Sequence, residues 1–121
     1  MHEHVKTWQN CAVIEKKDRT SQETFEVYSN CCVNDAYSLL NGKLYGCPFS
    51  AHADNLKAIP KFDNDFIDLL SNKRNNIEIG LKRLTDNKKY FDACNYCNGR
   101  DYNTTNVPAA VQTKEILNYE I

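Results

Sequence analysis

Six cysteines are the side chains of this 121-residue sequence that are best suited to chemistry. Cys94 and Cys97 form a C-x2-C pair, a spacing at which one turn can direct two thiolates to the same metal. Cys32 and Cys47 are separated by 14 residues and lie on either side of an Asn-Gly pair. Two sulfurs from each half would complete a four-thiolate site, a ligand set that both zinc and iron–sulfur clusters use.

A β-hairpin is the element that must position Cys32 and Cys47. Asn41-Gly42 is the strongest sequence signal for a two-residue type I′ turn, and it lies between the runs AYSLL and KLYGC. The register that this turn predicts pairs Leu40 with Lys43, Leu39 with Leu44, Ser38 with Tyr45, and Ala36 with Cys47.

Side-chain alternation along the hairpin predicts which cysteines face the same way. If the first strand runs back unbroken from the turn, Cys32 shares the face of Cys47, and Cys31 points to the opposite face. We therefore predict four ligands, namely Cys32, Cys47, Cys94 and Cys97. Any cysteine could instead be a buried core thiol, since free cysteine is among the most buried residue types. A redox pair at Cys94 and Cys97 is a third interpretation, although the βαβ pattern typical of thioredoxin is missing.

Two helices are predicted after the hairpin, where Pro48 ends the strand pairing. Segment 61–74 has apolar residues at helical spacing, namely Phe62, Phe66, Leu69 and Leu70. Segment 75–89 repeats this pattern with Ile77, Leu81 and Leu84, and an asparagine at 75 or 76 is its expected N-cap. We interpret three acidic residues of the first segment as its solvated face: Asp63, Asp65 and Asp68.

The N-terminal part, residues 1–30, carries weaker signals. Residues 24–28 (TFEVY) and 11–14 (CAVI) are predicted strands, and the polar segment between them is an expected loop. Taken together, the sequence predicts a single α+β domain over residues 1–121. Its expected parts are a central β-hairpin, two helices and a cysteine-bearing turn, brought together around a metal or cluster site.

Charge and hydropathy exclude several classes of function. Fifteen basic residues are balanced by sixteen acidic ones, so the formal net charge is −1 and no nucleic-acid binding is expected. The short basic runs at 15–19 and 81–89 are expected to be solvated. Neither a signal peptide nor an apolar run of about 18 residues is evident, so no membrane span is expected and a cytoplasmic setting follows as the default. There, cysteines are more often metal ligands or free thiols than disulfides.

The cysteine spacing resembles a known family. Cys32, Gly42 and Cys47 read as C-x9-G-x4-C, and the C-x2-C pair follows. This arrangement resembles the SPASM and twitch domains, which are C-terminal extensions of radical S-adenosylmethionine (SAM) enzymes. The stretches LLNGKLYGCPFSAHADNL, CNYCNGRD and VPAAVQT are similar to one subgroup of these extensions, and the resemblance covers residues 8 to 113.

The resemblance implies one auxiliary [4Fe–4S] cluster, as in the twitch form, held by Cys32, Cys47, Cys94 and Cys97. Cys31 also satisfies the family spacing, and Cys11 is a further alternate ligand. The C-x3-C-x2-C motif that binds the SAM-cleaving cluster is absent from this sequence. We therefore expect a domain that is not catalytic alone, that belongs or is related to a radical SAM enzyme, and whose partner is a radical SAM core.

Two roles are expected for such a cluster. Four protein thiolates leave no iron open for a substrate, so the cluster would relay electrons or staple a small domain. The alternative is an interaction module stapled by a four-cysteine zinc site. Asn98, Gly99 and Arg100 are candidates for tuning the sulfurs, and His52 is a candidate hydrogen-bond donor or replacement ligand.

Overall fold

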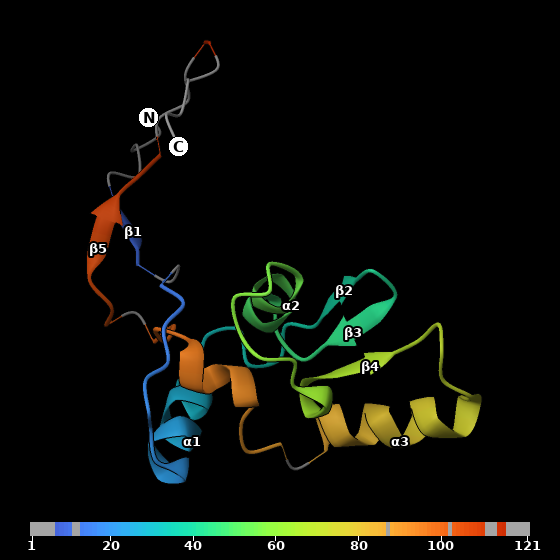
Figure 1. Ribbon diagram of the computed structural model, residues 1–121. Coiled ribbons are helices and arrows are strands. Elements are labelled where there is room, and N and C mark those ends of the chain that lie inside the picture. The colour runs from blue at the N-terminus through green and yellow to red at the C-terminus, as the bar shows by residue number, and fades with distance from the viewer. Residues whose placement is uncertain (1–6, 11–12, 87, 102, 111–113, 116–121) are drawn as a thin grey trace, which may run out of the picture.

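The computed structural model of the protein describes residues 7–10, 13–86, 88–101, 103–110 and 114–115. Within these ranges the chain forms three α-helices, two short 3-10 helices and two small antiparallel sheets (Figure 1), which confirms the predicted α+β class. The helices are α1 (Ser21–Ser29), α2 (Pro48–Asn55) and α3 (Arg74–Thr85), and the 3-10 helices are η1 (Asp63–Asp65) and η2 (Asp92–Tyr96). The predicted number of two helices is therefore too low. No helix in the described part of the chain has the length and apolar character needed to cross a membrane.

The strands form two separate sheets. One is a two-stranded ribbon of β1 (Thr7–Gln9) and β5 (Asn106–Pro108). The other has three strands in the order β2 (Ser38–Leu40), β3 (Lys43–Tyr45) and β4 (Phe66–Asp68). In Figure 1 the three-stranded sheet lies between α2 and α3, and the β1–β5 ribbon extends away from these elements.

The predicted hairpin is confirmed in its turn and in its register. Strands β2 and β3 pair the three residue pairs closest to the turn as expected. Asn41 and Gly42 have φ angles of 53° and 75°, the left-handed conformation that a type I′ turn requires. The predicted extension of the first strand back to Cys32 is wrong, because β2 begins at Ser38. The preceding chain turns instead, and the Ala36 amide donates to the carbonyl three residues before it at 3.1 Å.

The strand predicted at residues 24–28 is wrong, because these residues lie in α1. Thr20 is the N-cap of this helix, and its hydroxyl accepts a hydrogen bond from the Glu23 amide at 3.2 Å. The Glu23 carboxylate accepts one from the Thr20 amide at 3.3 Å, which completes a capping box. Of the other predicted strand, residues 11–12 lie outside the described residues, and Ile14 forms an isolated antiparallel bridge with Cys97.

The helix predicted over residues 61–74 is also wrong, because this segment contains η1 and β4. Strand β4 adds to the free edge of the hairpin by pairing with β3. This pairing buries Phe66 and Ile67, which are 7% and 3% exposed, on opposite faces of the sheet. Asp68 ends the strand, since its carboxylate accepts the amides two and three residues further on at 3.0 and 3.2 Å. Burial on both faces of a sheet thus outweighs the helical spacing.

The second predicted helix is confirmed as α3. It begins after Lys73, which is the N-cap in place of either asparagine that follows. Leu84 is 1% exposed, and it belongs to a core cluster with Ile67 of β4 and Phe91. Cys94 packs against this same cluster, so the main core reaches directly to the C-x2-C turn.

Helix α2 follows the hairpin directly and is not among the predicted elements. Cys47 is its N-cap, and Pro48 occupies its first turn, where the missing amide hydrogen of proline costs nothing. Ala51 and Ala53 are each 1% exposed and belong to two different core clusters, so α2 packs into the core on more than one side. The Cys-Pro step therefore marks a helix start as well as the end of strand pairing.

Candidate functional site

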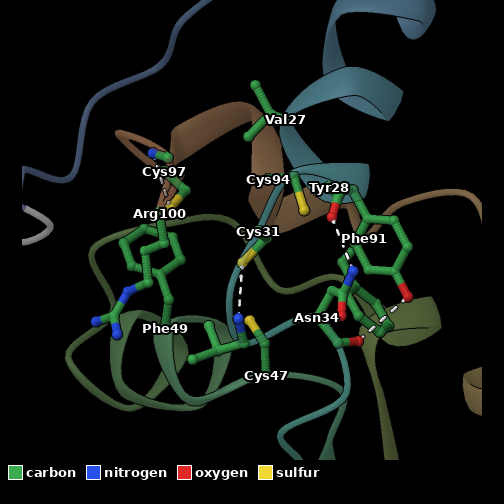
Figure 2. Close-up of a pocket in the computed structure, with 12 residues that line it drawn as sticks. Val27, Tyr28, Cys31, Asn34, Cys47, Phe49, Phe91, Cys94, Cys97 and Arg100 are labelled. Atoms are coloured by element: carbon green, nitrogen blue, oxygen red, sulfur yellow. Dashed lines mark hydrogen bonds between the residues drawn. The ribbon is translucent and has the colours of Figure 1, made fainter. Parts of the chain in front are cut away.

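Four cysteines line one cavity of about 30 Å³, and they come from three separate segments. Cys31 follows α1, Cys47 caps α2, and Cys94 and Cys97 lie within and directly after η2. Figure 2 shows their sulfur atoms turned toward the same space. The remaining lining is largely apolar and consists of Val27, Tyr28, Val33, Asn34, Phe49, Phe91, Gly99 and Arg100.

The structure places Cys31, and not Cys32, in this cavity. The Cys31 amide donates to the Tyr28 carbonyl at 3.2 Å, so Cys31 continues the last turn of α1. Cys32 is exposed, and its amide donates to the Arg100 carbonyl at 2.8 Å. The alternate ligand Cys31 therefore has the position that the hairpin argument assigned to Cys32. Cys11, the other alternate, lies outside the described residues.

Backbone amides donate hydrogen bonds to three of the four sulfurs. The Sγ atoms of Cys31 and Cys97 each accept from the amide two residues further along, at 3.4 and 3.3 Å. The Cys47 Sγ accepts from the amide three residues further along, at 3.3 Å. Gly99, the donor to Cys97, has a φ of 92°, a left-handed conformation that favours glycine. Donors aimed at sulfur stabilise its anionic form, which is the form that binds metals.

Burial opposes ionisation of the same thiols. It raises the pKa of Cys47 to about 11 and that of Cys94 to about 12, and it also raises the pKa of Cys31. A metal that binds these sulfurs at neutral pH must therefore displace protons. Among the described residues, no three His, Cys, Asp or Glu side chains are placed to hold one single metal ion.

Asp65 fixes the start of the C-x2-C turn. Its side chain is buried, with the residue 1% exposed, so the interpretation of Asp65 as part of a solvated face is wrong. The carboxylate accepts hydrogen bonds from the amides of Asp92 and Ala93, both at 2.9 Å. These are the first two residues of η2, so Asp65 satisfies amides that a helix start leaves without partners.

Arg19 fixes the end of the same turn. Its guanidinium Nη1 donates to the carbonyls of Cys94 and Cys97 at 2.6 and 2.9 Å. Its own amide donates to the Asn95 side chain at 2.9 Å. The basic run at 15–19 is thus not wholly solvated as predicted, since Arg19 is partly buried against η2.

The other tuning candidates differ in their positions. Arg100 lines the cavity, and its Nε is buried without a hydrogen-bond partner among the described residues. Its charge partly offsets the effect of burial on the pKa of Cys31. The Asn98 side chain donates to the Asn10 carbonyl at 2.6 Å, so it ties the turn to the N-terminal segment. His52 is exposed and does not line the cavity.

Tyr28 and Phe91 in the cavity wall, and Arg19 and Asp65 behind it, were not predicted from the sequence. The sequence does contain a signal for Tyr28. The Thr20-x-x-Glu capping box predicts a helix, and Tyr28 lies in the last turn of that helix. Arg19 and Asp65 have no local signal. Their partners lie 75 and 78 residues away for Arg19, and 27 and 28 residues away for Asp65.

Gly46 leaves room for the cavity wall, and we predict that Gly46→Ala destabilises the protein. A Cβ at this position would lie 2.0 Å from Cζ of Phe91, which is 1% exposed. The ring cannot withdraw freely, because it meets Tyr28 edge-on with centroids 5.6 Å apart. We expect urea denaturation to show that the free energy of unfolding falls by about 1–3 kcal/mol. Adding Phe91→Leu should cost less in this variant than in the wild type, whereas full additivity would contradict the proposed clash.

The chain matches no protein-family model and no curated protein. The resemblance to the SPASM and twitch domains therefore stays a prediction, carried by the cysteine spacing and the residues around it.

Proposed function

We propose that this chain is an auxiliary [4Fe–4S] cluster-binding domain whose ligands are Cys31, Cys47, Cys94 and Cys97. The observation that carries the proposal is the convergence of four thiols from three segments on one largely apolar cavity. Four cysteine thiolates are the ligand set of such clusters. The resemblance at the hairpin and the C-x2-C pair supports the same assignment, with Cys31 in place of Cys32.

The surroundings of the sulfurs also suit a cluster. Three sulfurs accept backbone N–H groups, and hydrogen bonds to sulfur are one of the factors that set cluster potentials. Tyr28, Phe49 and Phe91 line the cavity, and an apolar lining of this kind favours a site with little water. The buried Nε of Arg100 supplies positive charge beside an anionic group. When bound, the cluster would supply one-electron transfer, or it would staple three segments of a small domain.

The position of this domain in a larger enzyme follows from the same proposal. A site closed by four protein ligands leaves no iron for a substrate, so we infer an electron relay or a structural role. The partner of an electron relay would be a radical SAM core, on the same chain or on another. The cysteines would then contribute to that enzyme without forming its catalytic centre.

A structural zinc site is the second candidate. The cavity of about 30 Å³ favours it, because a single ion occupies less space than a cluster. A tetrahedral zinc site requires four sulfurs to converge on one point, at about 2.3 Å from the metal. The ligands of a cluster attach to separate irons, so they can remain further apart. The two candidates therefore demand different movements of the same four side chains.

Metal analysis of the protein purified without oxygen tests the proposal. We expect brown protein with about four irons and four sulfides per chain after anaerobic reconstitution, the composition of a [4Fe–4S] cluster. Colourless protein that retains one zinc per chain after the same treatment would support the zinc candidate instead. Iron, sulfide and zinc must be measured on one sample, because zinc can occupy thiols that have lost a labile cluster.

A further inference from the structure

We propose that Arg19 and Asp65 are positioning residues that hold the two ends of the C-x2-C turn and shift the reduction potential of its cluster in opposite directions. The part concerning the potential rests on the proposed function. The part concerning the turn rests on contacts within the chain and does not require a metal.

The hydrogen bonds of Arg19 reach both cysteines of the pair. One guanidinium nitrogen donates to the carbonyls of Cys94 and Cys97, at 2.6 and 2.9 Å. These carbonyls belong to the two proposed ligands themselves. The guanidinium is therefore fixed on the same residues whose sulfurs line the cavity. The adjoining segment strengthens this contact, since the Lys17 amide donates to the Asn95 carbonyl at 2.8 Å. Hydrogen bonds from Glu15, Lys17 and Arg19 therefore tie the end of η2 to the N-terminal segment.

Asp65 holds the start of η2 with a negative charge, as Arg19 holds its end with a positive one. It is 1% exposed, and both of its oxygens accept backbone amides of η2 at 2.9 Å. An anion at the start of a helix and a cation at its end both complement the helix dipole. The turn is thus held between two fixed charges of opposite sign, one on the hairpin side and one on the N-terminal segment.

The two charges should act oppositely on the site. Reduction adds negative charge, so a nearby cation favours the reduced form and a nearby anion disfavours it. The carboxylate of Asp65 is fixed on the amides of Asp92 and Ala93, and Ala93 directly precedes Cys94. Arg19→Gln should therefore make the potential more negative, and Asp65→Asn should make it more positive. A purely structural role would loosen the turn in both variants without opposite shifts.

Matched controls are available next to each residue. Lys16→Gln removes a positive charge three residues from Arg19, where the side chain is 61% exposed. Asp63→Asn removes a negative charge two residues from Asp65, where the side chain is 86% exposed. Solvent and salt screen exposed charges, so both controls should leave the potential close to that of the wild type. Arg19→Lys keeps the positive charge and a donor nitrogen, so it should shift the potential less than Arg19→Gln does.

Two readouts keep the outcomes distinct. The first is amide hydrogen exchange of residues 92–98 in the metal-free chain, which should become faster in Arg19→Gln and Asp65→Asn and stay unchanged in the controls. The second is the midpoint potential of the reconstituted chain, followed by its visible and electron paramagnetic resonance spectra during titration with dithionite. Unchanged exchange would overturn the positioning of the turn, whatever metal the protein binds.

Shifts of the same sign, or shifts no larger than those of the controls, would overturn the electrostatic part while leaving the cluster assignment intact. A wild-type chain that takes up no iron and sulfide would overturn both the proposed function and the effect on potential. In that case the exchange rates alone still decide whether Arg19 and Asp65 hold the turn.

Discussion

Replacing Cys31 with serine should abolish cluster binding, whereas replacing Cys32 should leave the cluster content close to that of the wild type. Cys31 lines the cavity, and its sulfur accepts a backbone amide at 3.4 Å. Cys32 is its immediate neighbour but is exposed, and its backbone amide donates to the Arg100 carbonyl. The two variants therefore form a matched pair in composition and position. Iron and sulfide per chain, with the visible absorbance after anaerobic reconstitution, measure the result.

The other proposed ligands serve as positive controls in this experiment. Cys47→Ser, Cys94→Ser and Cys97→Ser should each lose the cluster as Cys31→Ser does, because every one removes a thiolate from the same four-ligand set. Loss of the cluster in Cys32→Ser together with retention in Cys31→Ser would show that the hairpin argument had chosen the correct ligand. Thermal unfolding of the metal-free variants separates the loss of a ligand from the loss of the fold.

The difference between these neighbouring cysteines shows where the sequence was informative. The type I′ turn at Asn41-Gly42 is a local signal, and it predicted the register of β2 and β3 correctly. The face of Cys32 depended on an unbroken strand over six further residues, and β2 begins only at Ser38. The orientation of Cys31 is instead set by α1. The capping box of this helix is visible in the sequence, but the β propensity of residues 24–28 favoured a strand there.

Non-local pairing explains the other differences. The spacing of apolar residues in segment 61–74 fits a helix, but the free edge of β3 recruits residues 66–68 as a strand. No pattern within that segment reports the presence of an edge elsewhere in the chain. The C-x2-C pair was identifiable because its spacing is local, whereas the charged residues that hold it come from distant segments. Candidate ligands were therefore easier to predict than the residues that support them.

Asp65 should make the metal-free protein less stable as the pH rises from about 4 to about 6. The pKa of its carboxyl is raised from 3.8 to about 6, with burial as the largest cause and the charge of Asp92 acting in the same direction. The amides of Ala93 and Asp92, and the charge of Lys88, oppose this rise. Between these pH values the folded state binds more protons than the unfolded state, so the free energy of unfolding falls with increasing pH. The difference between the two pKa values corresponds to a change of about 3 kcal/mol in the free energy of unfolding.

Asp65→Asn isolates this contribution, because the amide keeps the shape of the carboxyl but does not ionise. Urea denaturation at pH 4, 5, 6 and 7, with chelator and reductant present, should show a decline in the wild type that the variant lacks. At pH 4, where the Asp65 carboxyl is protonated, the variant should be about 1 kcal/mol less stable than the wild type, since its amide nitrogen cannot accept one of the two backbone N–H groups. The exposed Asp63→Asn should retain the wild-type slope. A wild type that gains stability over the variant as the pH rises would mean that the two backbone donors outweigh burial and lower the pKa of Asp65.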